Sequence, residues 1–410
     1  MTEAQRAGGY GRGARILAVG IASTGLFTFA YFSVASYVLN DEQTGAVNLL
    51  WSILFITISV IYRPVEQLLS RSIATRRAQG HAGAHPLRSA ALIQAAAAAL
   101  FLVAAFALKD VLVDEFDSEA LFWVLIASTL AYAGSYFARG YLAGHEWFGL
   151  YGGLVLFESI SRFCFPVAVA VGLADGQTAV ALGIAAAPFA SLLVVPWALR
   201  RHAGGAGEAS EVRDDTGFAV SVAAGQLAEQ TLLNVAVILA TDQAAVIFAA
   251  FLITRAPLQL FQAIQTSLLP HLSGLEATEG SDAFARAIRQ TLLAVAGFAG
   301  AVAAGLLLLG PWAMSILFDI EHDYSRWGLA IIAIGMGFHL ASGALNQAAL
   351  ARGRAAAAAA SWLTAAGAYV AIMAVAGGDA LWRAEIGYAA CTALLFVLLL
   401  LGYRQPRSAA

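Results

Sequence analysis

Two charged residues four positions apart, inside an otherwise apolar stretch, are the part of this sequence best suited to do chemistry. Glu158 and Arg162 have the spacing and order that bring their side chains together on one face of a helix. Either the pair is a structural contact, or Arg162 attracts an anionic head group such as a phosphate while Glu158 orients it. Because Arg162 is the only basic residue expected deep inside an apolar stretch, its loss is expected to leave Glu158 unpaired.

Four polar side chains share one face of a later apolar stretch. At about 100° per residue they fall within an arc of about 140°. They are Gln226, Glu229, Gln230 and Asn234. A stripe this polar cannot face lipid, so it either lines water or packs against polar groups of another helix. Glu229 has no basic residue within one helical turn, which makes it the candidate for coupling to H+ or Na+.

Two arginines hold matching positions in the two halves of the chain. Arg63 and Arg255 are each followed closely by proline, which disfavours helix in the residue before it, so a helix is expected to end or bend there. Such arginines either extend their charge to the membrane surface or receive a phosphate entering from that side. The segment 70–79 is typical of a basic amphipathic helix on an anionic membrane surface.

Signatures of soluble enzymes are missing. Lys109 is the only lysine, which rules out a phosphate-binding GxxxxGK[ST] loop. Cys164 and Cys391 both fall in apolar stretches, so neither belongs to a disulfide framework or a CxxC metal motif. We expect no metal site and no cofactor, and any energy must come from an H+ or Na+ gradient, from the substrate or from a partner.

The elements that carry these residues are apolar runs long enough to cross a bilayer, which takes about 20 residues. Of the 410 residues, 60% are hydrophobic and 12% are charged. The predicted fold class is therefore an all-α polytopic membrane protein. Its net charge of −3 and scattered basic residues argue against a nucleic-acid partner. Twelve transmembrane helices are expected near 16–39, 46–62, 89–108, 120–143, 150–173, 178–199, 218–240, 244–264, 288–310, 327–350, 356–376 and 381–402.

The spans divide into two halves of six. The loop from Arg200 to Gly217 is rich in glycine and charge, as expected of a linker. IYRPVEQLL (61–69) in the first half is similar to ITRAPLQLF (253–261) in the second. Two pseudo-symmetric lobes of this kind would place a central cavity between them. The predicted organisation is an N-terminal six-helix lobe, a cytoplasmic linker and a C-terminal six-helix lobe, over residues 1–203, 204–216 and 217–410.

The distribution of basic residues predicts the orientation of the chain. With a cytoplasmic N-terminus, Lys109, Arg326 and Arg383 fall on the outer face and two arginines lie within spans. With Arg255 counted at the inner end of the eighth span, that leaves 18 of the 23 Arg and Lys residues on the inner face. Because positively charged loops stay in the cytoplasm, both termini are expected on the cytoplasmic side of the plasma membrane.

Three segments resemble one family. They are RPVEQLLSR (63–71), RGYLAG with FGLYG and FESISR (139–162), and RAPLQLFQAIQTSLLPHLS (255–273). They are similar to polysaccharide biosynthesis proteins of the Wzx type in their actinobacterial form, which belong to the multidrug/oligosaccharidyl-lipid/polysaccharide exporter superfamily. The resemblance covers most of the chain. It adds Arg139 to Arg63, Arg162 and Arg255 as candidate substrate-binding residues.

The resemblance implies a flippase that moves undecaprenyl-diphosphate-linked oligosaccharide from the inner to the outer leaflet by alternating access. Its partners would be that lipid-linked oligosaccharide, membrane lipids, a glycan polymerase and glycosyltransferases. Alternatives from the same superfamily are a flippase for peptidoglycan precursors and a drug or cation antiporter. A membrane glycan polymerase or ligase is an alternative of another class, but such an enzyme needs a sizeable outer loop. The longest expected outer loops, near Lys109–Glu119 and Pro311–Arg326, are short.

A topology reporter tests the orientation. Fused after Gly205 it should give a cytoplasmic signal, and fused after Asp117 or His322 an external one, because the basic residues gather on the proposed inner face. A cytoplasmic signal at Asp117 would overturn the proposed arrangement.

Overall fold

The computed structural model describes residues 3–78, 87–201, 212–255, 281–318, 324–351 and 354–404. Within these ranges the chain folds into helices joined by turns, and no strand occurs. The helices form two compact units, residues 1–227 and 228–410, which are treated separately below. The division falls within α10 (Val212–Leu239). Of the expected linker, 204–216, only the part from Val212 is described, so its role stays a prediction.

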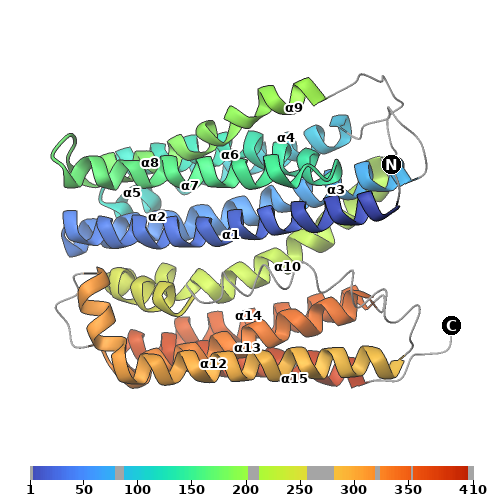
Figure 1. The fold of residues 1–410 in the computed structure, drawn as a ribbon. Helices are drawn as coiled ribbons and strands as arrows, with labels where there is room; N and C mark the ends of the chain where they lie inside the picture. The colour runs from blue at the N-terminus through green and yellow to red at the C-terminus, as the bar shows by residue number, and fades with distance from the viewer. Residues whose placement is uncertain are drawn as a thin grey trace. The chain divides into compact units, whose positions relative to one another are not determined.

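In the described part of the first unit, the elements are nine α-helices, a 3-10 turn and the start of α10 (Figure 1). They are α1 (Glu3–Val38), α2 (Asp41–Ile61), α3 (Arg63–Ala78), α4 (Leu87–Ala107), α5 (Lys109–Phe116), α6 (Glu119–Gly144), α7 (Phe148–Ala170), α8 (Gly176–Ser191), η1 (Leu192–Val194) and α9 (Val195–Arg201). In the second unit, the rest of α10 is followed by η2 (Thr241–Gln243), a helix over residues 244–255, α12 (Ser281–Phe318), α13 (Arg326–Ala351), α14 (Ala355–Val375) and α15 (Ala380–Arg404).

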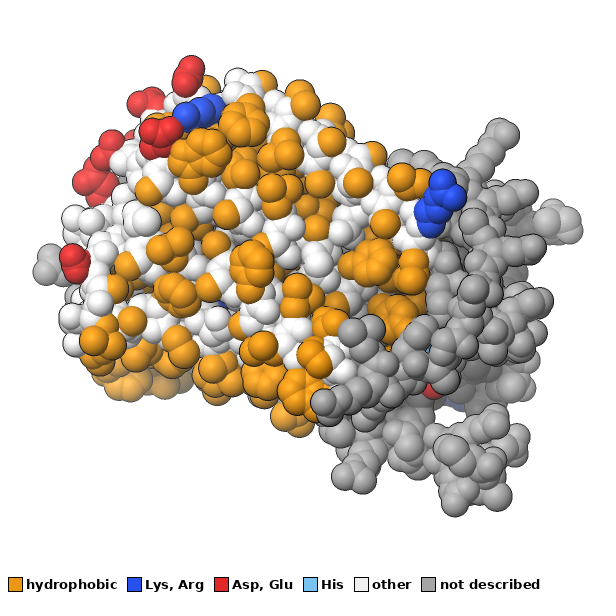
Figure 2. Space-filling model, turned by 90° about the horizontal axis from the view of Figure 1, so that it is seen from above, with side chains coloured by type: hydrophobic (Ala, Val, Ile, Leu, Met, Phe, Trp, Pro, Cys, Tyr) orange, Lys and Arg blue, Asp and Glu red, His pale blue; other side chains and the backbone are white. Residues whose placement is uncertain are grey.

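Most of these helices can cross a membrane. Among the described residues, nine helical segments are long and apolar enough, and Ala223–Leu239 with Thr241–Arg255 forms a further pair bent by 91°. The first expected span lies within α1, whereas the eighth, 244–264, extends past residue 255 and out of the described ranges. In the coloured part of Figure 2, hydrophobic side chains are spread over the middle of the face, and the few charged ones lie near its edges. The chain is thus an all-α, multi-pass membrane protein.

Helices α1, α3, α6, α7 and α8 make the principal contacts of the first unit. α7 packs on α1 and α8, and α6 packs on α3 and α8. The buried Tyr31 hydroxyl of α1 donates to the Val180 carbonyl of α8 at 2.9 Å. α3 and α6 touch backbone to backbone, because a Cβ on Gly140 would lie 2.7 Å from the Glu66 carbonyl oxygen. Small residues allow this close approach, which a membrane interior favours.

The second unit is organised around α13. In the most apolar stretch of α13, 78% of the residues are buried, whereas in that of α12 only 17% are buried. α13 is therefore central, and α12 faces outward. α13 packs on α12 and α15, and α14 packs on α15. The buried Tyr388 hydroxyl lies 3.0 Å from the Met336 sulfur, and that of Tyr369 donates to the Ala384 carbonyl at 3.1 Å. Tyrosines therefore connect α15 to both of its neighbours.

Local sequence sets where the helices begin and where the membrane ends. α2 starts with a capping box, in which the Asn40 side chain accepts the Gln43 N–H at 2.8 Å. Exposed tryptophans follow the starts of several spans, as expected of side chains anchored at a membrane interface. Trp327 and Trp382 lie in the first turns of α13 and α15, and Trp123 lies in the second turn of α6.

The two expected outer loops are partly helical, which corrects the prediction of loops there. Residues 109–116 form α5, which buries Phe116 and is closed by an ion pair of 2.7 Å between Lys109 and Glu119. α12 continues through Pro311 to Phe318 instead of stopping near residue 310. Proline is tolerated in membrane helices because neighbouring groups can satisfy the carbonyl that it frees.

The glycine contact between α3 and α6 gives a stability prediction. Gly140→Ala should lower the free energy of unfolding by about 1–3 kcal/mol, because the added methyl group has no space against the α3 backbone. Gly149→Ala is the matched control, since nothing lies within 4 Å of its added Cβ and alanine favours helix. Thermal unfolding of the purified protein measures both, and equal melting temperatures would contradict the packing.

Candidate functional site

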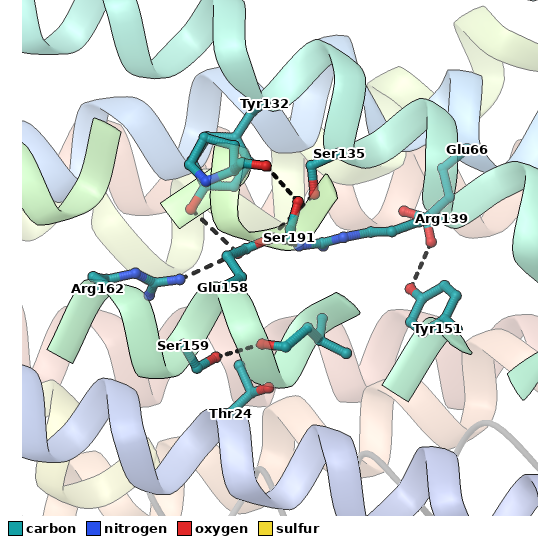
Figure 3. Close-up of polar contacts among 12 residues, drawn as sticks. Thr24, Glu66, Tyr132, Ser135, Arg139, Tyr151, Glu158, Ser159, Arg162 and Ser191 are labelled. Carbon is teal, nitrogen blue, oxygen red and sulfur yellow. Dashed lines mark hydrogen bonds and ion pairs between the residues drawn. The ribbon is translucent and has the colours of Figure 1, made fainter. Parts of the chain in front are cut away.

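Glu158 is bound by two arginines in the interior of the first unit. The carboxylate lies on α7 and is 4% exposed. Arg162 approaches its Oε1 at 3.2 Å from one helical turn away, as the spacing predicted, and Arg139 of α6 contacts its Oε2. Figure 3 shows the two guanidinium groups reaching Glu158 from opposite sides. Arg162 is therefore not the only deeply placed basic residue.

Two hydroxyl groups complete the contacts of Glu158. Tyr132 donates to Oε1 and Ser135 donates to Oε2, each at 3.2 Å (Figure 3). Tyr132, Ser135 and Arg139 occupy positions i, i+3 and i+7 of α6, so one helix face supplies all three groups. Both carboxylate oxygens thus have a charged and a neutral donor, as a buried charge requires.

The guanidinium groups rest on aromatic rings. Arg162 is 3% exposed, lies 4.6 Å from the ring centre of Trp51 and donates from Nη1 to Thr28 at 3.4 Å. Arg139 lies 4.5 Å from the ring centre of Tyr136. Cation–π contacts of this kind stabilise a desolvated arginine. The Nε atoms of both arginines are buried with no hydrogen-bond partner among the described residues, so both retain unused donor capacity.

The network continues toward α3. Tyr151 donates to Glu66 at 2.7 Å (Figure 3), and Glu66 interacts electrostatically with Arg139. Arg63, which is only partly buried, donates from Nη1 to Gln226 at 2.9 Å. The charged residues of the network, hereafter the arginine network, are Arg63, Glu66, Arg139, Glu158 and Arg162.

The polar stripe on α10 does not form one site. Gln226 belongs with Arg63, whereas the buried Asn234 and Gln230 bond to each other, with Asn234 Nδ2 at 3.1 Å from Gln230 Oε1. Glu229 is partly exposed and its Oε1 lies 3.9 Å from His339 Nε2 on α13. A basic partner that sequence spacing could not supply therefore comes from another helix. Ion coupling through Glu229 stays a prediction.

The two matching arginines are held differently. α2 ends at Ile61 and α3 begins at Arg63, so the predicted break occurs at Tyr62, but the apolar segment runs on from Asp41 to Ser70. Arg63 is therefore inside this segment and not at its end. Arg255 closes the helix over residues 244–255, and its Nη2 donates to the Leu233 carbonyl of α10. Pro257 lies outside the described residues.

Sequence reasoning missed the hydroxyl donors and Glu66. A signal was present, because Ser128, Tyr132, Ser135 and Arg139 recur at spacings of four, three and four residues and so define a polar stripe on α6. The predicted helix over 70–79 is confirmed as far as Ala78. Its arginine side chains lie outside the described residues.

Comparisons with known proteins bear on the fold. No protein-family model matches the chain, and no curated protein matches its sequence. Several solved structures match over nearly the whole length. A eukaryotic MATE transporter, AtDTX14, is 14% identical with a TM-score of 0.69, over 97% of each chain. The bent form of the Vibrio cholerae MATE transporter VcmN is 15% identical with a TM-score of 0.67, also over 97% of each chain.

A third structure has the same fold. It is the inward-facing conformation of a multidrug resistance MATE family transporter of the MOP superfamily, 13% identical with a TM-score of 0.68, over 95% of this chain and 96% of that one. The chain has the MATE transporter fold. At these identities the likeness concerns the fold alone. The arginine network lies in the first unit of that fold, and Glu229 and His339 lie in the second.

The arginine network gives a stability prediction. Glu158→Gln should lower the free energy of unfolding by about 3–5 kcal/mol, because it leaves two buried guanidinium groups with no charged partner at that position. Glu115→Gln, at an exposed position of α5, is the control and should leave the melting temperature unchanged. Similar melting temperatures for the two variants would show that the two arginines do not depend on Glu158.

Proposed function

We propose that this chain is an alternating-access flippase of the plasma membrane. Its cargo is undecaprenyl-diphosphate-linked oligosaccharide, a precursor of cell-surface polysaccharide, which moves from the inner to the outer leaflet. Two independent observations support the proposal. The likeness to MATE structures covers nearly the whole chain, and three segments resemble Wzx-type flippases, two of which contain residues of the arginine network.

The observation that carries the proposal is that two buried arginines share one carboxylate. A diphosphate that leaves water must replace its hydration with cations and hydrogen-bond donors. Arg139 and Arg162 offer both, because their charge exceeds that of Glu158 and their Nε atoms are unused. Guanidinium also matches phosphate oxygens through its planar fork of donors.

Because Arg139 and Arg162 both contact Glu158, one of them can leave the carboxylate for another partner. When Arg162 turns to a head group, Arg139 still neutralises Glu158, so no carboxylate is left uncompensated. Arg63, at the partly exposed end of the network, is placed to meet the phosphate first. Arg162, at 3% exposure, is reached only when the surrounding helices move apart, as alternating access requires.

An exporter of cationic drugs is the second candidate. It is favoured by the partly exposed Glu229 carboxyl near His339, and a multidrug resistance MATE transporter has the same fold. A flippase of peptidoglycan-precursor lipid would use the arginine network in the same way, because that lipid also has a diphosphate. The cargo that accumulates in a loss-of-function variant separates these candidates.

The decisive variant is Arg162→Ala. It should abolish surface polysaccharide while lipid-linked oligosaccharide accumulates in the inner leaflet, at normal protein level. The expectation that Arg162→Ala leaves Glu158 unpaired is wrong, because Arg139 still forms an ion pair with the carboxylate. Lipid extraction and surface glycan staining in the native host measure the effect.

Arg162→Lys is the matched control, and it should retain part of the export because it keeps the charge but loses the planar fork. Normal surface polysaccharide in Arg162→Ala, with the protein present in the membrane, would show that Arg162 is purely structural. Loss of drug resistance with intact polysaccharide would favour the exporter of cationic drugs.

A further inference from the structure

Glu385 is a buried carboxyl group that no predicted site includes. It lies in the second turn of α15 and is 4% exposed. Its Oε1 is buried and has no hydrogen-bond partner among the described residues. The carboxyl rests against the first turn of α13, where a Cβ on Gly328 would overlap it. The glycine thus makes the space that the carboxyl occupies.

Among the described residues, no cationic side chain forms an ion pair with Glu385. Tyr324, 5% exposed and just before α13, donates to the carboxyl, and Asp379 at the α14–α15 connection adds a second negative charge. The Tyr369 hydroxyl on α14 donates to the Ala384 carbonyl and not to Glu385. Arg383, on α15 itself, donates instead to the carbonyls of Met373 and Ala376.

The nearby helix start does not supply the missing donor. The Gly328 N–H is directed to the Ser325 hydroxyl at 3.4 Å, so it is not available to the carboxyl group. An isolated ionised carboxylate is expensive to bury, and in practice such a group is neutralised. Among the described residues no group of three or more His, Cys, Asp or Glu side chains could hold a metal ion. A proton needs no ligand besides the carboxyl group and neutralises it directly.

We propose that Glu385 is a proton-binding carboxyl group of the second unit. Packed against Gly328 it is a carboxylic acid, and it releases the proton to water when this end of α15 separates from α13. Protonation turns the carboxylate and a hydronium ion into the acid and water, so no further reactant is needed. Proton binding is independent of the cargo; only its use as a driving force rests on the proposed flippase function.

Infrared difference spectroscopy of the full-length protein in dodecyl maltoside, a detergent that contains no carbonyl group, tests this proposal. The spectrum at neutral pH should contain the C=O stretching band of a buried carboxylic acid, and alkaline buffer should remove it. Glu385→Gln should lack the band, whereas Glu115→Gln, at an exposed position, should retain it. Glu385→Asp, which keeps the group, should move the band without removing it.

Gly328→Ala gives a second, independent test. The added methyl group pushes the carboxyl away from α13 toward water, so the band should be lost at neutral pH although Glu385 is present. A band that is unchanged in Glu385→Gln would overturn the proposal, and so would a wild-type spectrum without it. A band that Na+ removes at constant pH would identify a sodium site instead. The measurement needs no cargo, so a failed flippase assay leaves its result intact.

Discussion

The sharing of Glu158 by Arg139 and Arg162 is the interaction on which the first unit depends. Each arginine also rests on an aromatic ring, and Arg162 reaches Trp51 of α2 and Thr28 of α1. The contacts of this one carboxylate and its partners therefore connect α1, α2, α6 and α7. Because a buried charge without a partner costs several kcal/mol, the relative positions of these helices are restricted, and the close glycine contact between α3 and α6 restricts them further.

The two units bury different charged groups, and the second also holds Arg255 against the Leu233 carbonyl. The first encloses the arginine network, whereas the second encloses Glu385 and partly encloses Glu229, with His339 as the basic neighbour of Glu229. An anionic head group and a proton are the ligands that these environments favour. On the proposed function, the first unit selects the cargo and the second responds to the proton gradient, so each task has its own set of helices.

Hydrophobicity predicted the helices well, because a membrane span must be long and apolar and must form its backbone hydrogen bonds within itself. It failed at residues 109–116 and beyond residue 310, where helix persists in segments expected to be loops. The pair of Glu158 and Arg162 followed from spacing within one helix. Contacts between helices, such as those of Arg139 with Glu158 and of Glu229 with His339, depend on packing that one sequence does not reveal. Glu385 was missed because one sequence does not show that its carboxyl group packs against Gly328. Nor does it show that Oε1 of this carboxyl group is buried without a hydrogen-bond partner among the described residues.

The central claim is that Arg162 recognises a diphosphate, and direct binding tests it without any transport. Native mass spectrometry of the full-length protein would compare undecaprenyl diphosphate with undecaprenol, which has the same chain and no charge. We predict that the wild type prefers the diphosphate and that Arg162→Ala loses about tenfold in its affinity for it, or about 1.4 kcal/mol, while undecaprenol binding is unchanged. Equal affinity of the two proteins for the diphosphate would contradict it.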